Sequence, residues 1–173
     1  MTDPMTSSAR AEADRPVEAT VLAFIAIIAA TALVAALGGL VAARDADPWY
    51  QALSKAPGTP PGFVFGVVWP TLYTLMAIGA CMVWRSAGSW KRADMALGLF
   101  FWQLLPNLGW SFLFFRYHLP LLALIDIVIL LVMVALMTRE FHRHSVVAAQ
   151  LQYPYLVWLT FAAYLNAWVV FAN

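Results

Sequence analysis

Five long apolar segments constrain this chain more than any other feature. They cover residues 17–43, 63–85, 93–115, 119–139 and 146–172. A helix needs about 20 apolar residues to cross a bilayer core, and backbone polar groups in lipid must be satisfied within the helix or in a closed barrel. None of the segments alternates as barrel strands do. The sequence therefore predicts an all-α membrane protein, a bundle of five transmembrane helices.

Composition agrees with this class and excludes others. The chain is 63% hydrophobic and 11% charged, whereas soluble domains are about a quarter charged. A net charge of +1 and the lack of a basic stripe argue against nucleic acid as a partner. The pair His142 and His144 is too weak a pattern to predict a metal site.

The polar parts of the chain divide it into a tail, a loop and short joints. Residues 1–16 read as a disordered tail, and residues 17–173 form one transmembrane domain. The first connection, residues 44–62, contains Pro57, Pro60 and Pro61, which exclude regular helix and stiffen the loop. We interpret this loop as a cap over one end of the bundle.

Basic residues predict the orientation in the membrane. Seven lie on the side of the tail and of the second and fourth connections: Arg10, Arg15, Arg85, Lys91, Arg92, Arg139 and Arg143. The opposite side has Arg44, Lys55 and Arg116. In a bacterial inner membrane, this bias places the N-terminus in the cytoplasm.

Amides and aromatic residues recur on the inner faces of three helices. Gln103, Asn107 and Trp110 share a face of the third helix, and amides facing lipid would be costly. The second helix has a similar stripe made of Phe65, Trp69, Tyr73 and Met76. The fifth helix has one made of Tyr155, Trp158, Ala162 and Asn166. Two readings stay open, namely a pocket for a large flat apolar ligand, or packing and hydrogen bonds between helices.

Asp126 is the one carboxylate deep within an apolar segment. An intramembrane acid suggests a functional role, and a structural tie between helices is an equal alternative. No second buried carboxylate accompanies it, and the chain has neither a nucleophile motif nor a nucleotide-binding loop. We therefore expect no catalytic residues of a conventional kind.

Five segments together resemble the translocator protein / tryptophan-rich sensory protein family, also called peripheral benzodiazepine receptors. They are WYQALSKAPGTPPGF, FGVVWPTLYTLM, LGLFFWQLLPNLGWSFLFF, LALIDIVI and YPYLVWLTFAAYLN. The resemblance implies a five-helix bundle, a homodimer, and a cavity closed by the first loop. It also implies porphyrins, sterols or synthetic drugs as ligands, a link to tetrapyrrole homeostasis, and no required cofactor.

Motif by motif, the resemblance also assigns a site. The implied pocket residues are Tyr50, Trp69, Tyr73, Asn107, Trp110, Trp158 and Ala162. We expect Trp49, Lys55, Pro60 and Pro61 of the first loop to form the cap, with Lys55 able to meet a propionate. Gln103 and Asp126 are further candidates for functional polar residues inside the membrane.

The chain departs from the family pattern at two places that concern ligands. Gly58 stands where the family often has Trp, which predicts a weaker grip by the loop. The C-terminus lacks the Tyr and the basic residue of the sterol motif, as in bacterial members. The leading hypothesis is an integral membrane porphyrin-binding sensory protein. The alternatives are a light-dependent porphyrin-degrading enzyme and a porphyrin or sterol transporter.

Overall fold

Glycine and proline set two of the ends of the long helices. In the computed structural model, which describes residues 17–43 and 48–173, Gly88 caps α4 (Gly62–Ala87) with φ 76° and donates its amide to the Trp84 carbonyl at 2.9 Å. Pro120 opens α6 (Pro120–His144), where its missing N–H costs no helical hydrogen bond. The tail predicted over residues 1–16 lies outside the described residues.

The described residues form five membrane-spanning units and contain no strand. The remaining elements are α2 (Val17–Ala42), α3 (Pro48–Ala52), α5 (Asp94–Ser111), a π-helical turn (Phe112–Arg116), α7 (Val146–Gln150) and α8 (Tyr153–Ala172). The predicted five-helix membrane bundle is therefore confirmed. The five spanning units have 23 to 27 residues each. At about 1.5 Å per residue, this length is enough for a bilayer core of about 30 Å.

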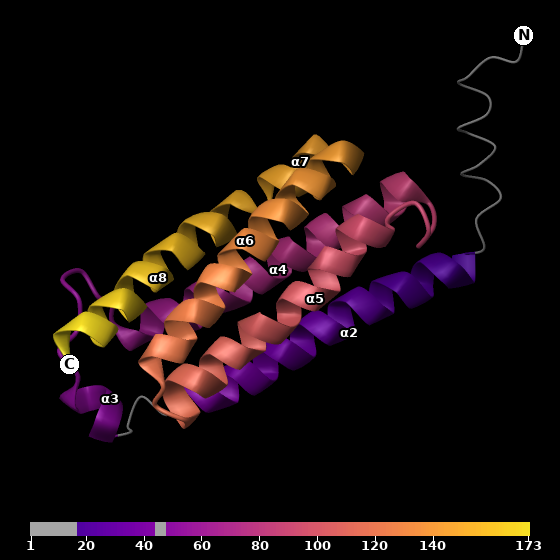
Figure 1. Ribbon diagram of the computed structural model, residues 1–173. Coiled ribbons are helices and arrows are strands. Elements are labelled where there is room, and N and C mark those ends of the chain that lie inside the picture. The colour runs from indigo at the N-terminus through magenta and orange to yellow at the C-terminus, as the bar shows by residue number, and fades with distance from the viewer. Residues whose placement is uncertain (1–16, 44–47) are drawn as a thin grey trace, which may run out of the picture.

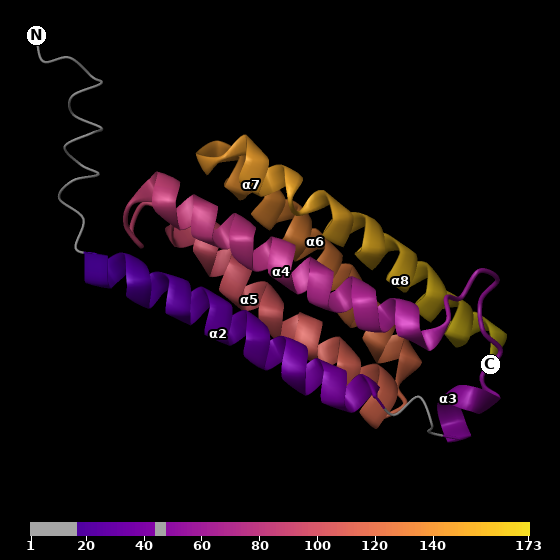
Figure 2. The ribbon, with the colours of Figure 1, turned by 180° about the vertical axis from the view of Figure 1, so that it is seen from behind.

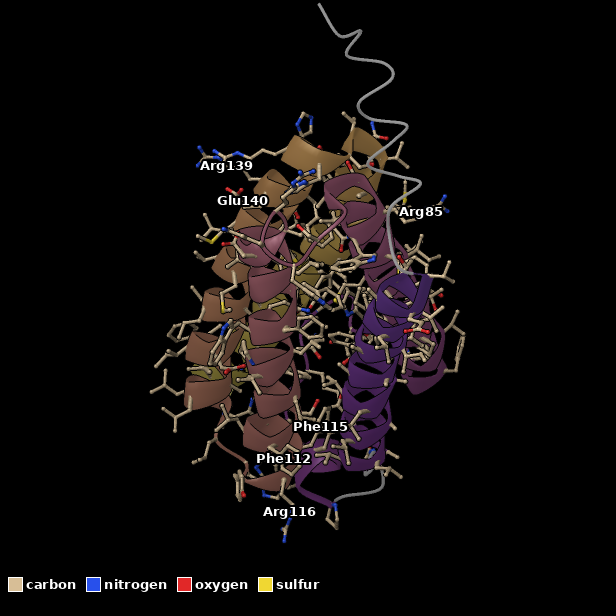
Figure 3. All side chains as sticks on the ribbon, turned by 90° about the vertical axis from the view of Figure 1, so that its right-hand side faces the viewer. Arg85, Phe112, Phe115, Arg116, Arg139 and Glu140 are labelled. Carbon is tan, nitrogen blue, oxygen red and sulfur yellow. The ribbon has the colours of Figure 1, made fainter. Side chains whose placement is uncertain are left out.

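The contacts between the long helices form a closed ring, and Figures 1 and 2 show these helices running side by side. Going round it, α2 packs against α4 and α5, α5 packs against α6, and α6 packs against α8. The ring closes where α7 and α8 contact α4. Arg85 and Arg139 lie at one end of the bundle and Arg116 lies at the other (Figure 3). The first end also carries Lys91, Arg92 and Arg143, so it is the more basic end among the described residues.

The core holds large apolar side chains, and the outer surface is apolar as well. Phe100, Met76 and Leu159 are fully buried inside the ring. Large apolar residues also face outward on every long helix; examples are Leu22 at 65% exposure and Val157 at 70%. A soluble protein would not expose so much apolar surface, so this surface is the one that contacts lipid.

The observed boundaries differ from the predicted ones in informative places. The fifth segment is interrupted at Leu151 and Gln152, so α7 and α8 replace one helix. Gln152 is fully buried and turns back to donate its Nε2 to the Ala148 carbonyl at 3.1 Å. Gly79 makes room for this amide, because a Cβ there would overlap it. The fourth helix runs on to His144, and the first loop contains α3 ahead of its prolines.

Candidate ligand-binding cavity under the first loop

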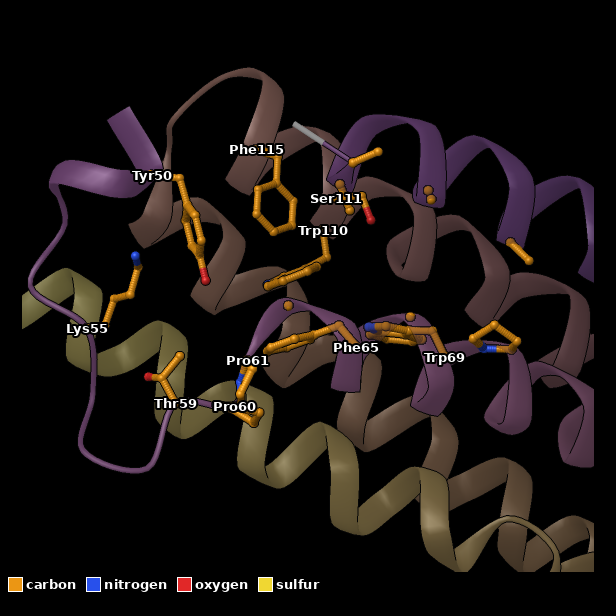
Figure 4. A pocket seen from close by; sticks show the side chains of 18 of the residues that line it. Tyr50, Lys55, Thr59, Pro60, Pro61, Phe65, Trp69, Trp110, Ser111 and Phe115 are labelled. Atoms are coloured by element: carbon orange, nitrogen blue, oxygen red, sulfur yellow. The ribbon is translucent and has the colours of Figure 1, made fainter. Parts of the chain in front are cut away.

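A cavity of about 880 Å³ lies beneath the first loop, between α2, α4 and the end of α5 (Figure 4). The loop supplies Tyr50, Lys55, Thr59, Pro60 and Pro61. The helices supply Phe65, Trp69, Tyr73, Trp110, Ser111 and Phe115. The structure therefore brings together seven of the residues predicted for the pocket and its cap.

Aromatic rings from two helices form the cavity walls. On α4, Trp69 lies 5.6 Å from Tyr73 between ring centroids, at an interplanar angle of 32°. On α5, Trp110 stacks on Phe114 at 5.2 Å and 15°. Trp110 also donates its indole N–H to Asn166 Oδ1 at 3.0 Å, which fixes the plane of its ring. Fixed aromatic planes of this kind suit a flat apolar ligand.

The third wall comes from α2 and consists of small residues. Ala35, Gly38, Gly39 and Ala42 all line the cavity. A Cβ added at Gly39 would meet no atom within 4 Å, and the same holds for Gly66 on the facing helix α4. These glycines therefore face open space, and larger side chains there would fill the cavity. Sequence reasoning missed this wall, although Gly38-Gly39 was its visible signal.

Proline adds one polar feature to the α4 wall. Pro70 lies inside α4 and has no amide proton, so the carbonyl oxygen of Gly66 lacks its usual helical donor. Both residues line the cavity.

Among the described residues that line the cavity, Lys55 is the only charged one. Its Nζ lies 4.7 Å from the centroid of the Tyr50 ring, within the range of a cation–π contact. The ammonium is exposed and stands at the loop side of the cavity (Figure 4). A ligand with an apolar body and a carboxylate at its edge would match this arrangement.

The loop is tied down to the end of α8. Ser54 N–H donates to Asn173 Oδ1 at 2.8 Å, and Asn173 Nδ2 donates to the Ser54 carbonyl at 3.3 Å. Further along, Tyr164 donates its hydroxyl to the Pro57 carbonyl at 3.2 Å. Gly58 follows with φ 82°, a left-handed conformation that favours glycine over the expected Trp. These exposed hydrogen bonds hold the cap closed without burying it.

Below the cavity, four polar side chains from three helices form a hydrogen-bonded chain. Tyr73 donates its hydroxyl to Asn107 Oδ1, and Asn107 Nδ2 donates to the Tyr155 hydroxyl. Tyr155 in turn donates to Gln103 Oε1 at 3.2 Å, and Gln103 Nε2 lies 3.0 Å from Met76 Sδ. All four polar residues are buried, and only Tyr73 reaches the cavity. Asn107 and Gln103 thus form a floor that joins α4, α5 and α8.

A model of the TspO/MBR family matches residues 24–171 of this chain. The chain belongs to the TspO/MBR family. It is 38% identical to the translocator protein of Bos taurus over 139 residues, which is 78% of this chain and 82% of that protein. It is 36% identical to the tryptophan-rich protein TspO of Chlorobaculum tepidum over 138 residues, 79% of this chain and 86% of that protein. It is 35% identical to the tryptophan-rich protein TspO of Archaeoglobus fulgidus over 153 residues, which is 88% of this chain and 98% of that protein.

In this TspO/MBR chain, four residues predicted for the pocket or its cap lie outside the cavity lining. Asn107 is one of them, because it is buried in the floor below the cavity. Trp158 packs edge-on against Trp69 at 6.5 Å and 86°, so it supports the wall from behind. Ala162 is buried in the core at 6% exposure. Trp49 stacks on His118 at 4.1 Å and 15°, so it anchors α3 to the turn before α6.

Asp126 also lies away from the cavity of this TspO/MBR protein. It is half-buried on α6 and faces α5, where a Cβ at Gly109 would lie 3.4 Å from Asp126 Oδ1. Its Oδ2 is buried and has no hydrogen-bond partner in the described part of the chain. No cluster of His, Cys, Asp and Glu suited to a metal occurs among the described residues. The geometry of Asp126 fits a contact between helices.

Proposed function

We propose that this membrane protein of the TspO/MBR family binds a porphyrin in the cavity under its first loop and acts as a sensor of tetrapyrroles. The observation that carries the proposal is the aromatic cavity itself, whose walls include Trp69 and Trp110. Among the described residues that line it, only Lys55 is charged. Its volume of about 880 Å³ is near the upper end for small-molecule sites, about 300–1,000 Å³.

The chemistry of the walls favours a large flat ring over a flexible chain. Trp69 and Trp110 present faces on which a macrocycle gains stacking and area burial. The glycines of α2 and α4 leave the gap between these walls open. Lys55 offers a cation to a propionate at the edge of the ring, while Tyr50 positions that cation.

A sensor also requires a segment whose conformation differs between the ligand-free and the ligand-bound protein. The capping loop is held to α8 by hydrogen bonds from Ser54, Tyr164 and Asn173, all of them exposed. Exposed contacts of this kind open at low free-energy cost, whereas the buried floor does not. The loop and the end of α8 are therefore the proposed route by which an occupied cavity signals to a partner.

The distribution of basic residues along the bundle suggests on which side of the membrane this cavity opens. α2 begins at the end of the bundle that carries α7, Arg85 and Arg139, and the loop lies at the opposite end (Figures 1 and 3). By the positive-inside tendency, the basic end would be cytoplasmic in a bacterial inner membrane. The cavity would then open on the outer side.

Titration in the dark with protoporphyrin IX tests the proposal, using purified protein in detergent and the Soret band of the porphyrin as the readout. Trp69→Leu should weaken saturable binding about ten-fold, because it removes a stacking face. Trp102→Leu is the matched control, since Trp102 is 65% exposed on α5 and lies outside the cavity lining. Equal loss in both variants, or only unsaturable binding, would refute a specific site at this cavity.

A further inference from the structure

A second cavity, of about 490 Å³, lies beside α7. Figure 1 shows α7 at the end of the bundle opposite the capping loop. The cavity is formed by the last turns of α6, by α7 and by the first turns of α8. Its lining on α6 includes Ala135, Arg139 and Arg143, and its lining on α8 consists of Tyr153 and Leu156. The porphyrin site shares no residue with this cavity.

The cavity has a closed floor and a polar rim. Thr138 and Ala149 form the floor and are buried at 7% and 1% exposure. The Thr138 hydroxyl donates to the Val134 carbonyl at 2.7 Å, so it is satisfied within α6. Around the rim, Arg139 and Arg143 are exposed, and Tyr153 is 50% exposed. The charged and hydroxyl groups of the lining are therefore accessible at the rim, and the space between them is open.

The rim carries positive charge that the described residues do not balance. Arg143 pairs with Glu140 at 2.8 Å, one turn away on the same helix. Arg139 forms no ion pair with any described residue, and the described lining contains no carboxylate. Figure 3 shows Arg139 and Glu140 at the basic end of the bundle. An anion in the cavity would thus meet an arginine that is still available.

Below the rim the surface turns apolar within one helical turn. Ala135 and Leu156 line the lower cavity, and the neighbouring α6 residues Val132 and Leu136 are 54% and 46% exposed toward lipid. Tyr153 stands at the boundary, as tyrosines do at the level of lipid headgroups. A ligand here would therefore have an anionic head beside the arginines and an apolar tail running down the helices.

We propose that this cavity between α6 and α8 is a binding site for one anionic phospholipid, whose phosphate lies beside Arg139 and whose acyl chain lies along Ala135 and Leu156. Charge complementarity selects this occupant, because basic pockets between helix ends suit anionic headgroups. The headgroup of a zwitterionic lipid carries a cation as well, which the arginines repel, so such a lipid should bind more weakly.

Native mass spectrometry of the full chain in detergent tests this site, with titration by phosphatidylglycerol or by phosphatidylcholine of the same acyl chains. We expect one phosphatidylglycerol to be retained more tightly than phosphatidylcholine. Arg139→Gln should weaken that first binding step about five-fold, the effect of one basic residue near a lipid surface. Lys91→Gln removes an exposed charge at the same end outside the cavity and should leave the step unchanged.

A second pair of variants tests the cavity without changing charge. Ala135→Phe fills the lower cavity and should also weaken phosphatidylglycerol binding, whereas Leu136→Phe, on the neighbouring lipid-facing position, should not. Both residues are exposed, so neither variant disturbs the core. Equal effects of Arg139→Gln and Lys91→Gln, or no effect of Ala135→Phe, would overturn the site. If equimolar glycerol phosphate displaced the lipid, the cavity would be a site for a soluble phosphate compound. That result would contradict the proposal that a phospholipid occupies it.

Discussion

The hydrogen-bonded floor predicts a defined loss of stability when Asn107 is replaced by Leu. Asn107 makes one hydrogen bond to Tyr73 and one to Tyr155, so it joins α5 to both α4 and α8. Hydrogen bonds between transmembrane helices contribute about 0.6 kcal/mol each on average and at most about 1.7. Asn107→Leu should therefore lower the free energy of unfolding by about 1.2 kcal/mol, and by no more than about 3.4 kcal/mol. Leu has the same number of side-chain heavy atoms and the same branching at Cγ as Asn, so the substitution leaves no cavity.

A double-mutant cycle with Tyr73→Phe tests the same reasoning. Alone, Tyr73→Phe should cost about 0.6 kcal/mol; in the Asn107→Leu background it should cost nothing, because its acceptor has gone. Reversible unfolding by SDS in mixed micelles, followed by circular dichroism, measures all four proteins. Tyr117→Phe is the control, since Tyr117 is 60% exposed. Fully additive costs, or an Asn107→Leu protein as stable as the wild type, would refute the floor as a stabilising network.

Three further predictions concern the cap and the buried acid. Lys55→Gln should weaken protoporphyrin IX binding up to about five-fold but leave its dimethyl ester unaffected, because an exposed ion pair contributes about 0.2–1 kcal/mol; a titration with both ligands checks this. Asn173→Ala should speed porphyrin dissociation in stopped flow, since it releases the loop at Ser54; Thr160→Val should not, because it removes a hydroxyl that donates to the Leu156 carbonyl of the same helix. Asp126→Asn should keep porphyrin affinity, because Asp126 faces Gly109 outside the cavity; a large loss in equilibrium binding would contradict this placement.

The apolar segments predicted the bundle because bilayer physics leaves few alternatives. A segment of about 20 apolar residues must be helical, and short joints make neighbouring helices antiparallel. The interruption at Gln152 could not be predicted from pattern. It depends on a buried amide that crosses to Gly79 of α4, a contact between positions far apart in the chain.

The candidate site was predictable in its residue types but only partly in its geometry. Periodicity placed Gln103 and Asn107 on an inner face, yet it could not say whether they meet a ligand or other side chains. The structure pairs them with Tyr155 and Tyr73. The α2 wall was missed because the pair Gly38-Gly39 fits close packing between helices as well as it fits a cavity wall. These residues matter here through the space that they leave at Gly39.

The most direct test of the account fills the cavity. Gly66 lines the cavity and faces open space, and Gly98 also has no atom within 4 Å of an added Cβ but lies outside the cavity lining. Equilibrium titration with protoporphyrin IX in the dark should show that Gly66→Phe abolishes saturable binding, while Gly98→Phe binds as the wild type does. Unchanged binding by a folded Gly66→Phe protein would contradict the claim that the porphyrin lies under the first loop.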